Sequence, residues 1–372
     1  MKVLVTGSNS FIGKNLIYHL KEIQNIEILT FNRSNTFKDI ENEMKDIDLI
    51  FHLIGTSRPS DPEEFYNVNY EITKNLVDII NEKNPSAKLI FSSSIQAELD
   101  NDYGHSKIMA ENYIRNNLKY YYIYRLHNIF GKWSRPNYCS VVANFCYNIA
   151  NDLDITINNP DKYIEFVYID DLCKEFIDIL TSDLYEDNTD VHYISNRYKI
   201  SIGQLAEKIR SFKNFPQSIY VQPNKDDFTN KLFATYLSFL PVEKCVYTPA
   251  GNNDTRGTFT ELIKTNNNGQ ISISITQPRL VRGGHFHHTK IEKIMIIKGN
   301  AKITFTNLND NKTFEFIVSD DKLEWIIVPV GYYHKIENLS NDEMIMLLWS
   351  NELFDKDNSD TFSITKKKGN VL

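Results

Sequence analysis

Residues 3–13 read Val-Leu-Val-Thr-Gly-Ser-Asn-Ser-Phe-Ile-Gly, a β-branched run that ends at a glycine and leads into a helical pattern. The apolar residues that follow recur at helical spacing, at Ile12, Leu16, Ile17 and Leu20. A strand, a glycine turn and a helix N-terminus in this order let backbone N–H groups approach a pyrophosphate. A glycine pair alone is often only a tight turn, and the flanking strand and helix favour a dinucleotide site.

Strands and amphipathic helices alternate along the chain as far as residue 240. We expect strands at 26–31, 49–53, 88–91 and 120–124, and helices at 70–81, 107–117 and 201–212. This alternation predicts an α/β fold with a doubly wound parallel sheet of the Rossmann type.

The pattern changes after Leu240-Pro241. Short alternating runs follow, separated by turn residues such as those from Asn266 to Gly269. These runs predict an all-β jelly-roll barrel. A chain of 372 residues is long enough for two cores, so we expect domains at 1–243 and 244–372.

Composition excludes several classes of protein. The net charge is −7, and no run of Lys and Arg indicates binding to nucleic acid or to an anionic membrane. No apolar stretch is long enough for a signal peptide or a membrane span. The four cysteines show no paired spacing, which fits a reducing compartment. We therefore expect a cytoplasmic protein without membrane insertion.

A second group of polar residues indicates catalysis in the front half. Ser92-Ser93-Ser94 ends a strand, and Tyr103 and Lys107 share one face of the next helix. A lysine beside a phenol is expected to lower its pKa, so that tyrosine exchanges a proton with a carbonyl oxygen, which a serine hydroxyl can steady. A lone Tyr-x-x-x-Lys is commonly a surface pair, but the serines and the glycine turn favour catalysis here.

The rear half carries four metal-ligand side chains. His285 and His287 lie two apart and point to the same face of a strand, and Glu292 and His334 can complete the cluster. Three imidazoles with one carboxylate suit Zn²⁺, Mn²⁺, Fe²⁺ or Ni²⁺. The sequence therefore predicts a metal site in the β-barrel.

The front half resembles extended short-chain dehydrogenase/reductases that act on nucleotide sugars. The matching motifs are Thr-Gly-x5-Gly, His52-Leu53-Ile54-Gly55, Asn69 to Leu76, the serine run, Tyr103-x3-Lys107, Arg125-x2-Asn128-x2-Gly131 and Val167 to Asp171. The resemblance implies a catalytic set of Ser94, Tyr103 and Lys107, with Asn128 on the substrate. It also implies a cofactor along Gly7, Ser10, Phe11, Ile12, Gly13, Leu53 and Gly55, with Tyr103 and Lys107 beside it.

Three departures from this pattern refine the expected chemistry. Ser10 replaces the usual middle glycine of the turn. Arg33 follows the second strand where an acidic residue would bind a free 2′-hydroxyl, so NADPH is expected rather than NADH. Ile95-Gln96 replaces the acidic pair of sugar 4,6-dehydratases, which favours reduction or epimerisation without loss of water.

The rear half resembles cupins. Both cupin motifs match at the ligand positions, whereas the glycine expected at the start of each is replaced by Arg279 and Leu323. The segment from Asp254 to Glu261 resembles the substrate-holding segment of nucleotide-sugar 3,5-epimerases. That resemblance implies Arg256 on phosphate or base and Glu261 on the nucleoside, and the alternative for each is an ordinary strand salt bridge.

The order of the two halves is similar to a family of capsular polysaccharide biosynthesis enzymes. That family implies a UDP-linked 2-acetamido-2,6-dideoxy-4-hexulose as substrate, zinc in the cupin and a homodimer. Only the 4-ketone makes the C3 hydrogen acidic, so C3 epimerisation in the cupin must precede reduction of C4 by NADPH. The implied product is UDP-2-acetamido-2,6-dideoxy-L-talose, a precursor for capsule or O-antigen. His288, Lys290 and Tyr333 are candidate cupin bases.

Two alternatives remain open. In the first, only the reductase is catalytic, and the cupin is a structural, sugar-binding or dimerising module whose four ligands leave no open metal position. In the second, which ranks low, the cupin is an iron-dependent oxygenase.

Overall fold

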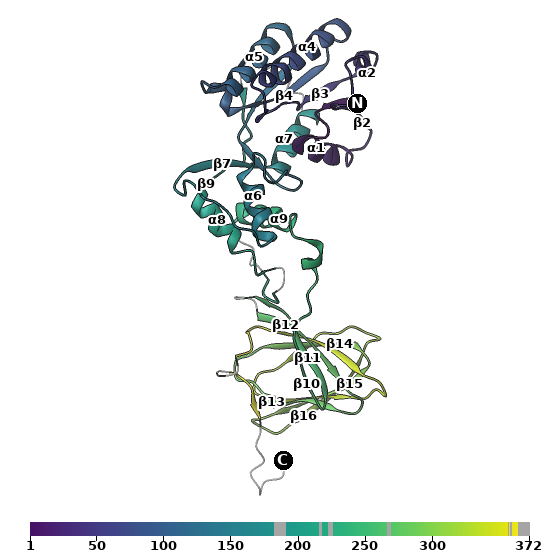
Figure 1. Cartoon of the computed structure of the whole chain (residues 1–372). Coiled ribbons are helices and arrows are strands. Elements are labelled where there is room, and N and C mark those ends of the chain that lie inside the picture. Colours follow the sequence, from purple (N-terminus) through teal and green to yellow (C-terminus); the bar gives the residue numbers. More distant parts are fainter. Residues whose placement is uncertain are drawn as a thin grey trace. The chain divides into compact units, whose positions relative to one another are not determined.

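The computed structural model describes residues 1–181, 191–215, 218–221, 226–265, 269–355, 357 and 359–363 (Figure 1). The turn expected at 266–268 lies outside these residues. The chain divides into two compact units, one of Met1–Lys213 with Asp226–Pro241 and one of Asn214–Lys225 with Val242–Leu372. No helix in the described ranges combines the length and apolar character needed to cross a membrane. None of the four cysteines forms a disulfide.

The first unit is built on a parallel sheet with the strand order β2-β1-β3-β4-β5-β8. These strands are β1 (Lys2–Thr6), β2 (Glu27–Phe31), β3 (Leu49–His52), β4 (Lys88–Ser94), β5 (Tyr121–Leu126) and β8 (Val191–His192). The connecting helices are α1 (Phe11–Leu20), α2 (Lys38–Glu41), η1 (Met44–Asp46), α3 (Glu63–Phe65), η2 (Tyr66–Glu71), α4 (Ile72–Lys83), η3 (Ile95–Glu98), α5 (Asp102–Asn117) and α7 (Ile169–Thr181). The predicted doubly wound α/β fold is confirmed.

Successive residues of β1 point to opposite faces of this sheet, and each face buries its own apolar cluster. Leu4 belongs to the cluster that contains Leu76 of α4 and Ile114 of α5. Val3 and Val5 belong to the other cluster, which includes residues of α1 and α7. Helices therefore cover both faces. Strand order reverses at β1, so the carboxyl ends of β1 and β3 form the crevice where such sheets bind ligands.

A smaller sheet, β6-β7-β9, completes the first unit. Its strands are β6 (Asn128–Phe130), β7 (Tyr163–Tyr168) and β9 (Tyr198–Ser201), and α6 (Val141–Ala150), α8 (Ile202–Arg210) and α9 (Asp227–Leu237) accompany them. A third cluster of buried aromatic and aliphatic side chains joins these elements, with Phe130, Phe166 and Phe212 among them.

The second unit holds two antiparallel sheets, ordered β10-β11-β12-β19-β14-β17 and β16-β15-β18-β13-β20. Their bounds are β10 (Gly251–Asp254), β11 (Gly257–Thr265), β12 (Gly269–Thr276), β13 (Val281–Phe286), β14 (Glu292–Lys298), β15 (Asn300–Asn307), β16 (Thr313–Ser319), β17 (Ile326–Val328), β18 (Tyr332–Asn338), β19 (Met344–Ser350) and β20 (Phe362–Ser363), after a short helix η4 (Val242–Cys245). One core contains residues of both sheets, such as Ile294 and Ile336. The predicted all-β, cupin-like half is confirmed.

A short piece of chain from before α9 also joins this second unit. Tyr220 forms a parallel bridge with Lys264 of β11. The Val221 N–H donates to the Lys264 carbonyl at 2.9 Å, and the Lys264 N–H donates to the Ile219 carbonyl at 2.7 Å. The chain therefore pairs with the β unit, returns to form α9, and enters the β unit again.

Candidate active site and candidate metal centre

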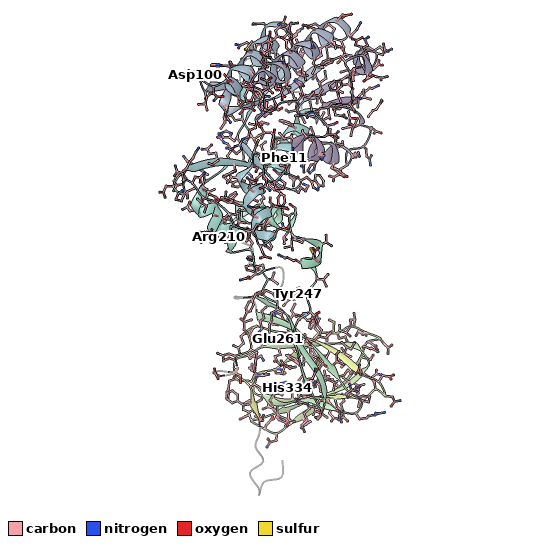
Figure 2. All side chains as sticks on the ribbon, viewed as in Figure 1. Phe11, Asp100, Arg210, Tyr247, Glu261 and His334 are labelled. Carbon is pink, nitrogen blue, oxygen red and sulfur yellow. The ribbon has the colours of Figure 1, made fainter. Side chains whose placement is uncertain are left out.

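The turn after β1 requires both of its glycines. Gly7 has φ +68°, and a Cβ there would lie 2.9 Å from the backbone of Leu53. A Cβ on Gly13 would lie 2.3 Å from the Gly7 carbonyl oxygen. Ser10, in place of a third glycine, caps α1 by accepting the Gly13 N–H at 3.1 Å. Phe11 then begins the helix, as Figure 2 labels it, followed by Ile12.

The loop after β2 leaves Arg33 exposed. The side-chain oxygen of Asn32 accepts the Ser34 N–H at 3.0 Å and the Ser34 hydroxyl at 2.7 Å. The Asn35 side chain accepts the Asn32 N–H at 2.9 Å. These bonds order a polar turn at the carboxyl end of the edge strand β2, next to β1, with the exposed Arg33 in the turn.

Ser94 and Tyr103 are hydrogen-bonded side chains at the end of β4 and the start of α5. Burial raises the pKa of Tyr103, and the bond to Ser94 offsets only part of this effect. The sequence-based expectation that Lys107 lowers the pKa of the phenol is therefore wrong in its net direction. The phenol therefore keeps its proton at neutral pH, which is the protonation state that a general acid needs.

Lys107 is almost fully buried, with 3% of its surface exposed. Its Nζ donates to the Ser92 carbonyl at 3.1 Å, and burial lowers its pKa to about 8. A Cβ on Gly55 would lie 3.0 Å from this Nζ, so that glycine admits the ammonium beside the crevice.

Asn69 holds the backbone beside this site in place, a role that its sequence motif did not predict. It is fully buried on η2, a π-helical segment. Its Oδ1 accepts the Thr56 N–H at 2.8 Å, and its Nδ2 donates to the Thr56 carbonyl at 3.0 Å and to the Ser106 hydroxyl at 2.9 Å. Ser106 in turn donates to the Tyr103 carbonyl at 2.8 Å. A π-helical segment often marks a functional site, but no pattern of apolar residues in the sequence predicts one here.

Two further residues lie near the expected sugar site. The Cys139 thiol is 3.3 Å from the Ser57 hydroxyl. Asn128 is exposed on β6, where its Nδ2 donates weakly to the Glu165 carbonyl at 3.4 Å.

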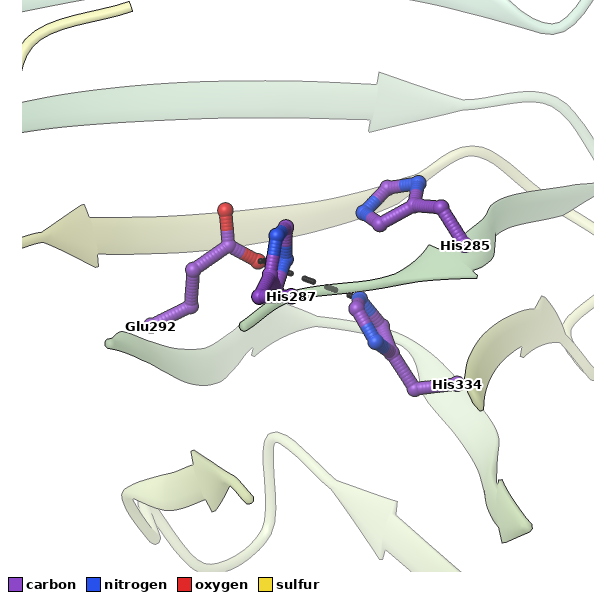
Figure 3. Close-up of side chains that lie close together, drawn as sticks. All are labelled: His285, His287, Glu292 and His334. Carbon is purple, nitrogen blue, oxygen red and sulfur yellow. Dashed lines mark ion pairs between the residues drawn. The ribbon is translucent and has the colours of Figure 1, made fainter. Parts of the chain in front are cut away.

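The expected metal ligands His285, His287, Glu292 and His334 converge in the second unit (Figure 3). Each offers a ligand atom within 4.8 Å of the others. The Glu292 Oε2 lies 3.3 Å from the His287 Nε2 and 3.8 Å from the His334 Nε2. The cluster draws on β13, the turn after it, β14 and β18, so it depends on both sheets.

The protonation of His285, His334 and Glu292 and the unpaired nitrogen of His287 fit a metal, although Glu292 raises the pKa of His287 against the effect of burial. Burial lowers the pKa of His285 and of His334 to about 4, so both rings are neutral at pH 7, as ligands must be. Burial opposes ionisation of Glu292, but His287 and Lys290 hold its pKa far below the usual range. The His287 Nε2 is buried without a hydrogen-bond partner. A divalent cation would satisfy that atom.

The three candidate bases differ in their surroundings. The Lys290 Nζ pairs with the Glu292 Oε1 at 2.8 Å. The Tyr333 hydroxyl lies beside Gly284, since a Cβ there would be 3.4 Å from it. The exposed His288 ring packs on Phe286 and Phe362, the opposite side of the strand from His285.

Arg256 and Glu261 both form ion pairs. Arg256 lies in the turn between β10 and β11, with its Nη2 2.6 Å from Asp254, and that carboxylate also binds Arg282 at 3.1 Å. The charge of Arg256 contributes to the lowered pKa of His285. Glu261 pairs with Lys264 at 2.8 Å, and Figure 2 labels it in the same unit as His334. Arg279, where a glycine was expected, has φ +64°, so the backbone keeps a glycine-like turn.

Comparison with family models defines the class. Residues 3–191 match the NAD dependent epimerase/dehydratase family, and residues 252–362 match the polysaccharide biosynthesis C-terminal domain. The chain belongs to the NAD dependent epimerase/dehydratase family.

Individual relatives cover nearly its whole length. The UDP-2-acetamido-2,6-beta-L-arabino-hexul-4-ose reductase of Pseudomonas aeruginosa is 40% identical over 99% of this chain and 100% of its own. The crystal structure of the capsular polysaccharide assembling protein CapF from Staphylococcus aureus has a TM-score of 0.89 and 36% identity over 98% of this chain and 100% of its own. The predicted similarity to capsular polysaccharide enzymes is confirmed.

A more distant structure supports the fold alone. UDP-glucuronic acid 4-epimerase from Bacillus cereus, in complex with NAD, is 17% identical, covers 64% of this chain and 98% of its own, and has a TM-score of 0.55.

Proposed function

We propose that the chain is an NADPH-dependent reductase of a UDP-linked 4-keto-6-deoxy-N-acetylhexosamine, and that its cupin unit epimerises C3 of the same sugar. The observation that carries the reductase is the placement of Ser94 at the end of β4, with Tyr103 and buried Lys107 on α5, at the carboxyl edge of the parallel sheet. The full-length similarity to a UDP-sugar reductase supports the substrate class.

Each residue of the reductase site has a separate role. NADPH supplies the hydride that reduces C4. The Tyr103 hydroxyl gives its proton to the C4 oxygen, and burial keeps that proton in place until transfer. The Ser94 hydroxyl orients the same oxygen, while the Lys107 ammonium, anchored on the Ser92 carbonyl at 3.1 Å, stabilises the phenolate that remains.

The choice of NADPH follows from Arg33. We propose that the guanidinium binds the 2′-phosphate of the adenosine, and the ordered turn at Asn32 and Ser34 beside Arg33 supports this role. Gly7, Gly13, Leu53 and Gly55 line the path of the dinucleotide, and Ser10, Phe11 and Ile12 begin the helix that faces its pyrophosphate.

The cupin step uses the acidity that the ketone gives to C3. His285, His287, Glu292 and His334 would hold Zn²⁺, which as a Lewis acid favours the enolate form of the substrate. Lys290 and Tyr333 remain candidate bases, whereas the His288 ring lies on the other side of the strand. Arg256, Glu261 and, in the first unit, Asn128 are proposed to contact the UDP-sugar. Reduction after epimerisation would give UDP-2-acetamido-2,6-dideoxy-L-talose for capsule or O-antigen synthesis.

We also propose a homodimer through the second unit. A hollow of about 470 Å³ lies between the edge strands β16 and β17, and its lining includes Phe314, Phe316 and Trp325. These aromatic side chains are 47–49% exposed. Exposed apolar surface on unpaired strand edges is the type of surface that a second copy covers.

Solvent-exchange NMR tests both activities together. The protein is incubated in D₂O with a UDP-linked 4-keto sugar, with and without NADPH. Deuterium at C3 without NADPH, followed by NADPH oxidation when it is added, is the expected result. The control, His334→Ala, should lose the exchange because it removes a metal ligand.

Two other outcomes have defined meanings. No deuterium at C3 with normal NADPH oxidation would leave a single-activity reductase whose cupin is a structural, sugar-binding or dimerising module. No NADPH oxidation with any such sugar would refute the reductase itself.

A further inference from the structure

The last described residues, 359–363, lie beside the strand that carries the metal ligand His285, and we call this segment the strap. Within it β20 pairs antiparallel with β13, with Ser363 opposite His285 and Phe362 opposite Phe286. The Phe362 ring packs on Phe286 and His288, with centroid distances of 5.6 and 4.8 Å. The strap therefore adds an edge strand to the strand that carries a metal ligand.

Asp360 in the strap binds the turn between two ligands. Its carboxylate accepts three backbone N–H groups, from His288 at 3.0 Å, Thr289 at 2.6 Å and Lys290 at 2.7 Å. It also accepts the Thr289 hydroxyl at 3.1 Å. Consecutive N–H groups that converge on one carboxylate fix the backbone of the turn. The turn links His287 to Lys290 and Glu292, so its shape sets their relative positions.

The backbone of Asp360 acts directly on a metal ligand. Its carbonyl oxygen lies 2.5 Å from the Nδ1 of His287. A carbonyl oxygen only accepts hydrogen bonds, so the Nδ1 carries the proton. In the neutral ring the Nε2 then has a free lone pair, and this Nε2 is the buried atom 3.3 Å from Glu292. The strap thus selects the tautomer in which His287 presents its ligand nitrogen to the cluster.

We propose that the strap is a structural part of the metal centre and that Asp360 is a positioning residue, whose carbonyl orients His287 and whose carboxylate holds the 288–290 turn. The inference rests on the proposed metal site. Partners of this kind typically change metal affinity 10–100-fold when they are removed. The strap is more than 70 residues from His287 along the chain, so metal binding and the C-terminal segment are coupled through folding.

Zinc affinity of the full chain, measured by competition with a chromophoric chelator, tests this coupling. A chain ending at residue 358 should bind zinc about 10–100-fold more weakly than wild type. The matched control ends at residue 363 and should stay within about twofold. Asp360→Ala keeps the carbonyl and loses the carboxylate, so it should fall between the two, and Asp360→Asn, which retains an acceptor oxygen, should lose less.

A second control and a second measurement separate positioning from simple destabilisation. Asp355→Asn changes a carboxylate that precedes the strap and accepts the Asp357 N–H at 2.9 Å, and this variant should bind zinc normally. Amide hydrogen exchange at 288–290 in metal-free protein should accelerate in Asp360→Ala, with exchange in β15 unchanged.

Three results would contradict the proposal in distinguishable ways. Wild-type affinity in the chain ending at 358 would overturn the role of the strap while leaving the metal site intact. Unchanged exchange at 288–290 in Asp360→Ala would remove the role of the carboxylate. A wild-type chain that binds no zinc would instead refute the metal site on which the inference rests.

Discussion

His285 on β13 stands directly opposite His334 on β18, and their ring centroids are 4.5 Å apart. A bulge produces this pairing, because the register shifts between Gly283 and His285 and leaves Gly284 without a partner. Arg282 is paired with Ile336, and both side chains are buried. If the strand alternated regularly from Arg282, the side chain of residue 285 would point to the opposite face, away from the core. The extra residue turns His285 back toward His334.

Gly284→Ala should therefore weaken metal binding and lower stability. Gly284 has φ +83°, a conformation that costs alanine about 1–2 kcal/mol, so the substitution favours loss of the bulge. Gly299→Ala is the matched control, since Gly299 has φ +92° in the turn at the far end of β14 from Glu292. Both variants should lose free energy of unfolding, Gly299→Ala the more because a Cβ there would lie 2.7 Å from the Ser340 Oγ, but only Gly284→Ala should reduce zinc affinity. Equal zinc affinity in the two variants would contradict this account of the bulge.

Tyr103→Phe should slow NADPH oxidation by about 10²–10⁴-fold, because phenylalanine has no hydroxyl that can act as the general acid. Deuterium exchange at C3 should continue, since we propose that the second unit catalyses that step. Tyr113→Phe is the control on the same helix, where the hydroxyl donates to Asp78 at 2.6 Å on the surface. Absorbance at 340 nm reports the rate, and undiminished oxidation in Tyr103→Phe would remove the proposed acid.

The helices and strands lie close to their predicted positions where the apolar periodicity of the sequence is strong. The helix at Phe11–Leu20 and the strands of the parallel sheet lie where the pattern predicts them. The apolar run of β4 ends at Phe91, and Ser92, Ser93 and Ser94 end the strand as expected, although all three are buried polar groups. Hydrogen bonds from Ser92 to the His52 carbonyl and from Ser93 to Glu111 satisfy two of them. Apolar periodicity cannot predict that polar side chains will be buried with their hydrogen bonds satisfied.

The metal cluster was predictable as a set of residues, whereas its supports were not. Donor spacing alone indicated His285, His287, Glu292 and His334, and the structure brings all four together. Asp360 escaped notice, and Asn69 was matched only as part of a family motif with no role of its own, because both bind mainly backbone groups, and backbone groups look alike at every position of a sequence. Their partners are known only once the chain has folded.

Arg33→Ala should reduce the preference for NADPH over NADH. Loss of a charge-assisted bond to phosphate, about 1.5–3 kcal/mol, corresponds to a KM for NADPH that rises about 10–100-fold. The KM for NADH should hardly change, because NADH has no 2′-phosphate. Arg210→Ala, which removes an exposed arginine paired with Glu207 on α8, controls for net charge. An unaltered KM for NADPH in Arg33→Ala would show that another group binds the 2′-phosphate.

Phe316→Glu combined with Trp325→Glu should convert the proposed dimer to a monomer. Each substitution places a charge in the apolar hollow between β16 and β17, where a partner would exclude water. Sedimentation velocity should show a mass of 43.4 kDa for the variant and twice that for the wild type. Leu153→Glu, at a 53% exposed position of the first unit, should remain dimeric. A variant that keeps the wild-type mass would place the interface elsewhere.

The pH dependence of stability should reveal the buried ammonium of Lys107. Burial lowers its pKa from 10.5 to about 8, with Glu111 opposing the shift. Below pH 8 the lysine is charged in both states, and the folded state bears the full cost of burying the charge. Between pH 8 and 10.5 the folded state releases a proton that the unfolded chain keeps, so stability rises with pH. Wild type should therefore gain about 3 kcal/mol relative to Lys107→Met across this interval, measured by chemical denaturation at each pH. The corresponding difference for Lys174→Met, at an exposed position on α7, should stay constant, and a constant difference for Lys107→Met would contradict the lowered pKa.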